Sequence, residues 1–466
     1  MTPSGSGANS RLATGVFRRL IFAQESGLLL VISLVVVLLA VLGGDKEKPE
    51  IMFLRSPEAG PALVVERGPS ELRFQTAAGT QSFRFADGWT GSETSPGSWR
   101  LQRYEAVPIP AGAEVLEEAG NEHSAGAIVV RANGSTSRYA LDRGWRTDVL
   151  ADGSAAVLRN PRINKFLDPQ NLVLVGTSAA FFAIMAVGMT AIIAMNGIDL
   201  SIGSIYGIAA VVGALALTKL QPEGSGHAVP GVLSIPVGLL VCCGVGALCG
   251  ALNGALIVGL KVHPFIITLG MMAALRGVVF VMTQGNSISG LPSSFTGGFY
   301  KAQLGGVYPV PLLVTLLVVL AGMFVLSRTV FGRRVYAIGG NEVAARYAGI
   351  PVGRVKALTF TIAGMLAGLS ASASLGYYGA ATPQGGQGYE LQVIAASVIG
   401  GASLSGGRGT AFGAVLGAIL IQLIDNGMLI LEIDQSYNQI VMGAAIVAAV
   451  VLDQTKQKLG GPRRAH

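Results

Sequence analysis

The residue types that most often do chemistry in proteins are few and scattered along this chain. Its four histidines stand far apart, at positions 123, 227, 263 and 466, and no His-Glu-x-x-His motif occurs. The sequence also lacks a Gly-Lys dipeptide, which excludes a phosphate-binding P-loop. Cys242, Cys243 and Cys249 share one apolar segment and predict packed side chains, not disulfides. We therefore expect no catalytic residue, no metal site and no cofactor.

One arginine lies inside an apolar segment, where a charge is expensive. Arg276 interrupts the run "LGMMAALRGVVFVMTQG", and a charged side chain at membrane depth costs several kcal/mol unless it faces protein or water. We expect its guanidinium to face the protein interior and to bond a carboxylate or backbone carbonyls at a helix end. Two interpretations of Arg276 stay open: it forms a structural pair inside the protein, or it lines the path of a transported substrate. Asp425, in "LIQLIDNGM", lies nearer a helix end and predicts a cap.

A second polar cluster lies in "AMNGIDLSIGSIYG", residues 194–207. Asn196 and Gly197 break one apolar helix, Asp199 predicts the N-cap of the next, and Ser201 is expected in its first turn. The pattern indicates either a capped turn between two spans or a broken helix that lines a translocation path.

The third polar segment, "YAIGGNEVAARYAGI" at 336–350, stands between long apolar runs. Good helix formers fill its centre, and Gly339-Gly340 and Gly349 punctuate it, which predicts a helix of about two turns. It is either an ordinary loop or a protruding helix that inserts into a groove of a soluble partner. The residues expected at such a contact are Gly340, Asn341, Glu342, Ala344, Ala345, Arg346 and Gly349.

The elements that position these residues are predicted to be membrane helices. Of 466 residues, 51% are hydrophobic and 13% are charged, against about 25% charged in soluble domains. The net charge of +7 does not indicate nucleic-acid binding, because the cations cluster at helix ends. The chain is therefore expected to be an all-α polytopic membrane protein in contact with lipid.

About ten spans are expected. The first covers 21–43 and is too long for a signal peptide, and 1–20 and 454–466 are the tails. Segment 390–404 is short and Gly-interrupted, which favours a half-helix. Glycine ladders with four-residue spacing, such as Gly246-Gly250 and Gly364-Gly368, predict close helix packing. The other predicted spans are 172–195, 201–219, 231–260, 264–284, 307–327, 356–377, 409–428 and 437–452.

The short loops predict the orientation. With the N-terminus in the cytoplasm, fifteen lysines and arginines fall on inside segments, and only Lys219 and Lys301 fall on short outside loops. This bias places both termini and the loop 328–356 in the cytoplasm.

Residues 44–165 differ in kind from the rest. They hold 15 Lys/Arg and 16 Asp/Glu, no run long enough to cross a bilayer, and alternating stretches such as "ELRFQTA". Asn133-Gly134 between two such stretches is a type I′ hairpin signal. With the N-terminus in the cytoplasm, this segment follows the first span, so we expect an inserted β-rich domain on the extracytoplasmic side.

The segment 166–453 resembles the permease subunits of ribose/xylose/galactoside-type ABC importers, within the branched-chain amino acid/sugar permease superfamily. The resemblance rests on "NGIDLSIGS", "PFIITLGMMAALRG", "YAIGGNEVAARYAGIPVGRVK", "GGASLSGGRGTAFG" and "DNGM", which occur in the family's order. In this context "LSGGR" at 404–408, which is similar to the signature of ABC ATPases, predicts a Gly-rich break between helices. The insert 44–165 departs from the family, which joins its first two spans by a short loop.

The resemblance implies a transport subunit of a bacterial inner-membrane importer, not an enzyme. It implies a second permease subunit, a separate ATPase that contacts 336–350, an extracytoplasmic solute-binding protein and a monosaccharide-type solute. Two alternatives remain at this stage: a permease for branched-chain amino acids, and an ion-coupled secondary transporter. The latter requires a relay of intramembrane carboxylates, and the spans offer only Asp199, Glu390 and Asp425.

Overall fold

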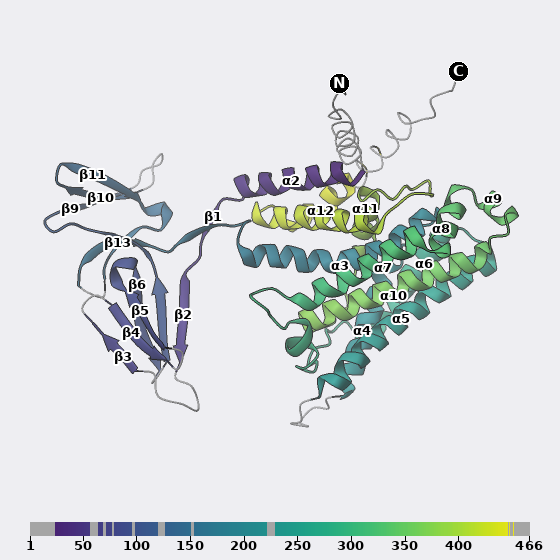
Figure 1. The fold of residues 1–466 in the computed structure, drawn as a ribbon, viewed down its shortest axis with the longest axis horizontal. Helices are drawn as coiled ribbons and strands as arrows, with labels where there is room; N and C mark the ends of the chain where they lie inside the picture. The colour runs from purple at the N-terminus through teal and green to yellow at the C-terminus, as the bar shows by residue number, and fades with distance from the viewer. Residues whose placement is uncertain are drawn as a thin grey trace, which may run out of the picture. The chain divides into compact units, whose positions relative to one another are not determined.

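The computed structural model forms two compact units, one mostly helical and one built of small β-sheets (Figure 1). The β unit is Gly44–Asp168, and the helical unit contains the rest of the chain. The predicted tails 1–20 and 454–466 lie outside the described residues. The structure describes residues 24–451 except 56–63, 69–70, 77–78, 96–97, 120–125, 151–152, 221–228, 446 and 448–450.

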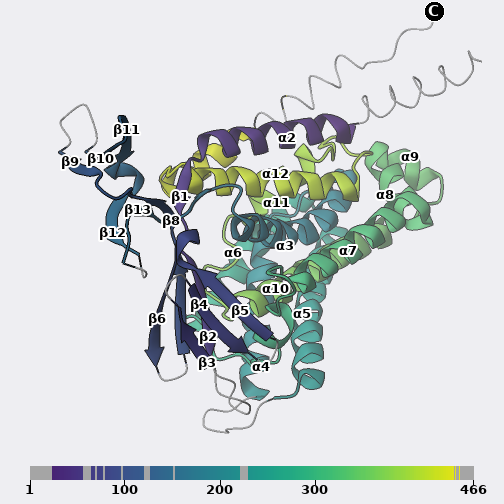
Figure 2. The same cartoon turned by 60° about the vertical axis from the view of Figure 1, so that its left-hand side comes forward.

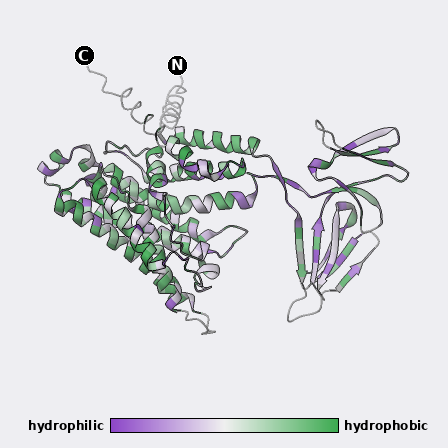
Figure 3. Ribbon diagram, turned by 180° about the vertical axis from the view of Figure 1, so that it is seen from behind, coloured by the Kyte–Doolittle hydropathy of each residue, from purple (hydrophilic) through white to green (hydrophobic). Residues whose placement is uncertain are grey.

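Eight helices among the described residues are long and apolar enough to cross a membrane, and the helical unit is predominantly hydrophobic in Figure 3. They are α2 (Gln24–Leu42), α3 (Pro169–Ala194), α4 (Ile202–Leu220), α5 (Gly231–Leu260), α6 (Pro264–Thr283), α7 (Pro309–Arg328), α10 (Val352–Tyr378) and α12 (Ala411–Ile430).

Ten spans were predicted, and eight helices of spanning length are found among the described residues. The segment predicted at 390–404 is the short helix α11 (Tyr389–Ile399), whose 11 residues span about 16 Å and fall short of a bilayer. The segment predicted at 437–452 lies partly outside the described residues, and residues 438–445 of it are helical.

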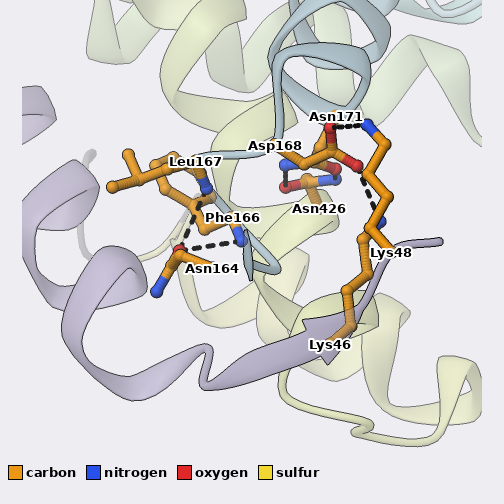
Figure 4. A network of polar contacts seen from close by, with 8 residues as sticks. All are labelled: Lys46, Lys48, Asn164, Phe166, Leu167, Asp168, Asn171 and Asn426. Atoms are coloured by element: carbon orange, nitrogen blue, oxygen red, sulfur yellow. Dashed lines mark hydrogen bonds and ion pairs between the residues drawn. The ribbon is translucent and has the colours of Figure 1, made fainter. Parts of the chain in front are cut away.

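The core of the helical unit is packed around α3, α4, α10 and α12, which bury most of their residues. Figure 2 shows α3 between α12 and α10. Helices α5 and α10 cross with their backbones in contact, because a Cβ added at Gly246 would overlap the Gly364 carbonyl oxygen. This crossing confirms the close packing predicted from the glycine ladders. Asn171 and Asn426 exchange two side-chain hydrogen bonds, of 3.1 and 2.7 Å, between α3 and α12 (Figure 4).

The β unit contains antiparallel sheets of two or three strands. Asn133 and Gly134 join β10 to β11 with positive φ angles of 51° and 76°, which confirms the predicted hairpin. The strands are β1 (Asp45–Glu47), β2 (Glu50–Arg55), β3 (Val64–Arg67), β4 (Glu71–Thr76), β5 (Gly79–Arg84), β6 (Trp89–Ser95), β7 (Ser98–Arg103), β8 (Glu105–Pro108), β9 (Glu114–Glu118), β10 (Ala127–Ala132), β11 (Ser135–Ala140), β12 (Arg146–Val149), β13 (Ala155–Arg159) and β14 (Arg162–Asn164).

The first and last strands of the β unit, β1 and β14, pair with each other and hold its two ends together. The buried carboxylate of Asp168 accepts from Lys46 at 2.8 Å and from Lys48 at 2.7 Å (Figure 4). The Asn164 side chain accepts from the next backbone N–H groups, those of Phe166 and Leu167. Charge pairing and a local Asx turn therefore fix both ends of the insert.

Candidate functional site

The predicted contact segment forms two short helices, α8 (Val330–Gly340) and α9 (Glu342–Tyr347). Asn341 separates them and caps α9, because its side chain accepts from the Ala344 N–H at 2.9 Å. Gly349 ends α9 with a φ of 79°, and the N–H of Ile350 returns to the Ala345 carbonyl. These bonds form a Schellman motif, which requires a residue that tolerates positive φ.

The predicted glycine punctuation lies where α8 ends. Gly339 and Gly340 are the last two residues of α8, and Asn341 separates them from α9. Gly339 makes a close approach: a Cβ there would overlap the carbonyl oxygen of Ala194, the last residue of α3. Gly340 has open space around its Cβ position.

The charged side chains of α9 form a small ion-pair network. Glu342 accepts from Lys356 at 2.7 Å and from Arg346, one helical turn away, at 3.1 Å. The hydrogen bond from Lys356 is the main cause that holds the pKa of Glu342 below its usual range, with a smaller contribution from Arg346. The network ties α9 to the first turns of α10.

The faces of α9 differ in exposure. Ala345 is 4% exposed and packs inward, so this residue of the predicted contact set is not accessible to a partner in this conformation. Val343 and Tyr347, four residues apart, are 63% and 89% exposed. Our sequence reasoning missed these two residues, although the i, i+4 spacing of apolar side chains in a polar helix was available as a signal.

A cleft of about 1130 Å³ lies beside α9, between the α5–α6 turn and the start of α10. Basic side chains dominate its charged lining. The charged and titratable residues that line it are Lys261, His263, Glu342, Arg346, Arg354 and Lys356.

Backbone contacts tie α8 to the Gly-rich break at 400–410. The Tyr336 hydroxyl donates to the Gly409 carbonyl at 2.6 Å, and the Gly407 N–H donates to the Ala194 carbonyl at 2.9 Å. The end of α3, α8 and the "LSGGR" loop therefore form one packed joint.

That turn contains the second predicted cluster. Asn196 has a φ of 61° and an exposed side chain, whereas Asp199 and Ser201 are fully buried. The Asp199 carboxylate accepts from the Ser201 backbone N–H at 2.8 Å and from its hydroxyl at 2.6 Å. The Ser201 hydroxyl in turn accepts from Asn253 of α5, a partner that no local pattern in the sequence singles out.

The prediction that Asp199 is the N-cap of α4 is corrected. Ser201 takes that position, since its carbonyl accepts from the Ile205 N–H in the first helical bond. Asp199 instead closes an Asx turn across residue 200.

Arg276 lies on α6 and donates to the Gly385 carbonyl at 2.8 Å. This carbonyl belongs to the irregular segment 379–388. Of the two expected kinds of partner, a carboxylate or a backbone carbonyl, Arg276 therefore bonds a backbone carbonyl. The segment packs on the glycine face of α4, because a Cβ at Gly203 would overlap the Gly386 carbonyl and the Glu390 carboxylate. Arg276 is thus separate from the Asp199 cluster in its bonding, and its hydrogen bond ties segment 379–388 to α6.

Asp425, predicted as a cap, lies inside α12 and accepts from the Asn438 side chain at 2.6 Å. Asn438 lies beyond the C-terminal end of α12, and capping rules consider only the residues at the helix end, so they did not predict this pair. No group of three or more His, Cys, Asp or Glu side chains within the described segments could hold a metal ion.

Comparisons with known proteins agree with this architecture. Residues 171–450 match the family model described as "Branched-chain amino acid transport system / permease component". The chain is 39% identical over 295 residues to the ribose import permease protein of Bacillus subtilis strain 168, covering 62% of this chain and 87% of the relative. It is 37% identical over 294 residues to the D-allose transport system permease protein of Escherichia coli strain K12, covering 63% and 86% respectively.

A third relative is the autoinducer 2 import system permease protein of Enterobacter sp. strain 638, 36% identical over 318 residues, which cover 68% of this chain and 88% of the relative. No solved structure matches the chain. The family match begins after the β unit and includes the whole of α8 and α9. The chain therefore belongs to the branched-chain amino acid transport system permease family.

Proposed function

We propose that this chain is the membrane-spanning permease subunit of a bacterial ABC importer that carries a monosaccharide-type solute. The curated relatives named for ribose and D-allose transport support the substrate class. Energy comes from a separate ATPase, and the chain itself performs no chemistry. It works in the inner membrane with a second permease subunit and an extracytoplasmic solute-binding protein.

The observation that carries the proposal is the construction of α9. It is short, capped at both ends and fastened by Glu342 to α10, yet it leaves Val343 and Tyr347 uncovered. Exposed apolar side chains on a rigid helix suit insertion into a groove of a partner. We assign this helix, with the basic cleft beside it, as the surface that contacts the ATPase.

The joint between α8, α3 and the 400–410 loop supplies the route for coupling. Closure of the ATPase would displace α8–α9, and the backbone contacts at Gly339 and Gly407 would transmit the displacement to α3. The turn with Asn196, Asp199 and Ser201 follows α3 directly and leads into α4, so we place these residues beside the translocation path. We also place Arg276 beside this path, because it ties to α6 the segment 379–388 that packs on α4.

The charge bias of the short loops supports an orientation with both termini, α8 and α9 in the cytoplasm and with the β unit outside. In this orientation, α9 and the basic cleft face the compartment that contains ATP. The β unit faces the compartment from which the solute arrives.

Charge reversal on α9 tests the proposal. Glu342→Arg breaks both of its ion pairs and places a cation beside Lys356, so α9 loses its anchor on α10. Uptake of the solute should fall by about tenfold or more while the protein still inserts and accumulates in the membrane. Arg328→Glu, which changes a basic residue at the end of α7 outside the α9 network, is the control and should transport normally. Normal uptake in Glu342→Arg, with the ATPase still bound at full strength, contradicts the proposal.

A further inference from the structure

The β unit contains one structural pattern twice. Strands β4 and β5 begin at Glu71 and Gly79, and β10 and β11 begin at Ala127 and Ser135, displaced along the chain by one constant offset. Each pair of strands leads into a single 3₁₀ turn that ends at a glycine with positive φ. These two glycines, Gly88 and Gly144, are separated by the same offset.

The sheets repeat in the same way. In the first half, β2–β7–β6 form one sheet and β3–β4–β5 the other; in the second half, β8–β13–β12 and β9–β10–β11 do the same. The unit is therefore a tandem pair of one six-stranded module, which we call the first and second modules (residues 50–103 and 105–159).

Each module keeps the same side-chain cluster. Arg103 lies over the Trp89 ring and pairs with Glu50; in the second module Arg159 lies over Trp145 and pairs with Glu105. Each tryptophan also has an edge-on aromatic neighbour, Phe83 in the first module and Tyr139 at the equivalent position of the second. Because both modules contain this cluster, it does not distinguish one module from the other.

A cleft beside each cluster does distinguish them. In the first cleft, of about 410 Å³, Glu50 pairs with Arg103, Asp87 with Arg84, and Glu105 with Arg159. The charges that line it are thus already compensated.

The second cleft has a volume of about 590 Å³ and a different lining. Arg143 stands at the position that is equivalent to Asp87 of the first module. Only Glu105 and Arg159 of the lining pair with each other, and the Arg162 Nε is buried without a hydrogen-bond acceptor among the described residues. The lining residues are Asp45, Glu105, Asp142, Arg143, Arg159 and Arg162.

We infer that the second cleft binds a polyhydroxylated small molecule of the monosaccharide class. Arg143 and Arg162 are pure donors, whereas ionised Asp45 and Asp142 are pure acceptors. A hydroxyl group both donates and accepts, so a polyol satisfies both kinds of side chain. A simple anion would leave the two carboxylates uncompensated. The choice of monosaccharides among polyhydroxylated molecules rests on the proposed transport function, whereas the donor and acceptor lining of the cleft does not.

The chain offers a selective probe, because its three tryptophans, Trp89, Trp99 and Trp145, all lie in the β unit. The full-length protein in detergent is titrated with D-ribose and D-allose, and tryptophan emission is recorded together with calorimetric heats. We expect a saturable change with at least one of the two sugars. Loss of a charged hydrogen bond costs about 1.5–3 kcal/mol, so Arg162→Gln should weaken this binding by about tenfold or more.

Arg143→Asp, which installs the residue of the first module, should weaken binding to a similar extent. The matched control is Arg131→Asp, the same charge change on an exposed residue outside the cleft, and it should bind as the unchanged protein does. Two results overturn the inference: no saturable signal with either sugar by emission or calorimetry, and full affinity in both cleft variants. In the first case, binding of sulfate would mark the cleft as an anion site. Solute uptake measured on the same variants reports separately on the permease.

Discussion

Helix α9 and the seam between α4 and segment 379–388 hold polar groups in opposite ways. At α9 the contacts are made by side chains at the surface, with Glu342 shared between Arg346 and Lys356. At the seam the contacts are made by backbone, since Gly203 lets the Gly386 carbonyl approach α4, and Arg276 caps the neighbouring carbonyl of Gly385. The exposed side chains of the first arrangement have room to change conformation, whereas the second arrangement tolerates almost no added atom.

The largest expected effect is at the seam. Gly203→Ala places a methyl group where the Gly386 carbonyl and the Glu390 carboxylate lie, so segment 379–388 must move. Overpacking of this kind costs about 1–3 kcal/mol. Thermal unfolding of the detergent-purified protein should show a clear decrease in Tm.

The same substitution at Gly277, on α6 and next to Arg276, is the control. Its Cβ position is open, and alanine favours a helix over glycine by about 1 kcal/mol, so Gly277→Ala should preserve or raise the Tm. Equal losses at both positions would show that the seam is no tighter than an open helix face.

Arg276→Met should have the next largest effect. It leaves the Gly385 carbonyl without its donor, at a cost of about 1–3 kcal/mol. Arg276→Lys keeps the charge but loses the planar fork, so it should be intermediate. If the Tm of Arg276→Met is unchanged while uptake is lost, the residue belongs to the path and not to the seam; if neither changes, both assignments are wrong.

At α9, removal of exposed apolar area should weaken partner binding without loss of fold. The double change Val343→Ser and Tyr347→Ser leaves the ion pairs of Glu342 in place. Affinity for the ATPase, measured with both proteins purified, should fall by about tenfold, while the Tm changes by less than the seam variants. Leu240→Ser, at a side chain of α5 that is 70% exposed, is the control and should leave affinity unchanged.

The smallest effect concerns pH. The folded-state pKa of Glu342 is lowered by Lys356 and Arg346, so its pairs contribute stability above its ordinary value of 4.5. That contribution is lost as the pH falls through the lowered pKa. Because the group is partly exposed, the change is at most a few tenths of a kcal/mol. Tm measured between pH 7 and pH 3 should fall less steeply in Glu342→Gln than in the unchanged protein; parallel curves would contradict this assignment.

The two regions also differ in how far the sequence predicts them. Long apolar runs predicted the spanning helices, and helix formers between glycines predicted α9, because both signals are local. The close approach of Ala194 to Gly339 was not predicted, because Ala194 is far away in sequence. Asn253 and segment 379–388 were missed for the same reason: their partners come from other helices.

In the β unit, the Asn133-Gly134 turn was predictable from two residues. The duplication of the six-stranded module was not predicted, because the two modules share few residue types. The modules correspond in strand register and in their arginine–tryptophan pairs. The features that the sequence did not predict are therefore close contacts between segments that lie far apart in the chain.

The central claim is that ATP hydrolysis by a separate subunit drives the transport of a sugar through this chain. It is tested most directly by uptake of labelled D-ribose or D-allose into proteoliposomes that contain the chain, its ATPase and its solute-binding protein. Our account predicts uptake that requires ATP on the α9 side, survives a protonophore and is lost in Glu342→Arg. Uptake that persists without ATP and collapses when the ion gradient is dissipated would contradict it.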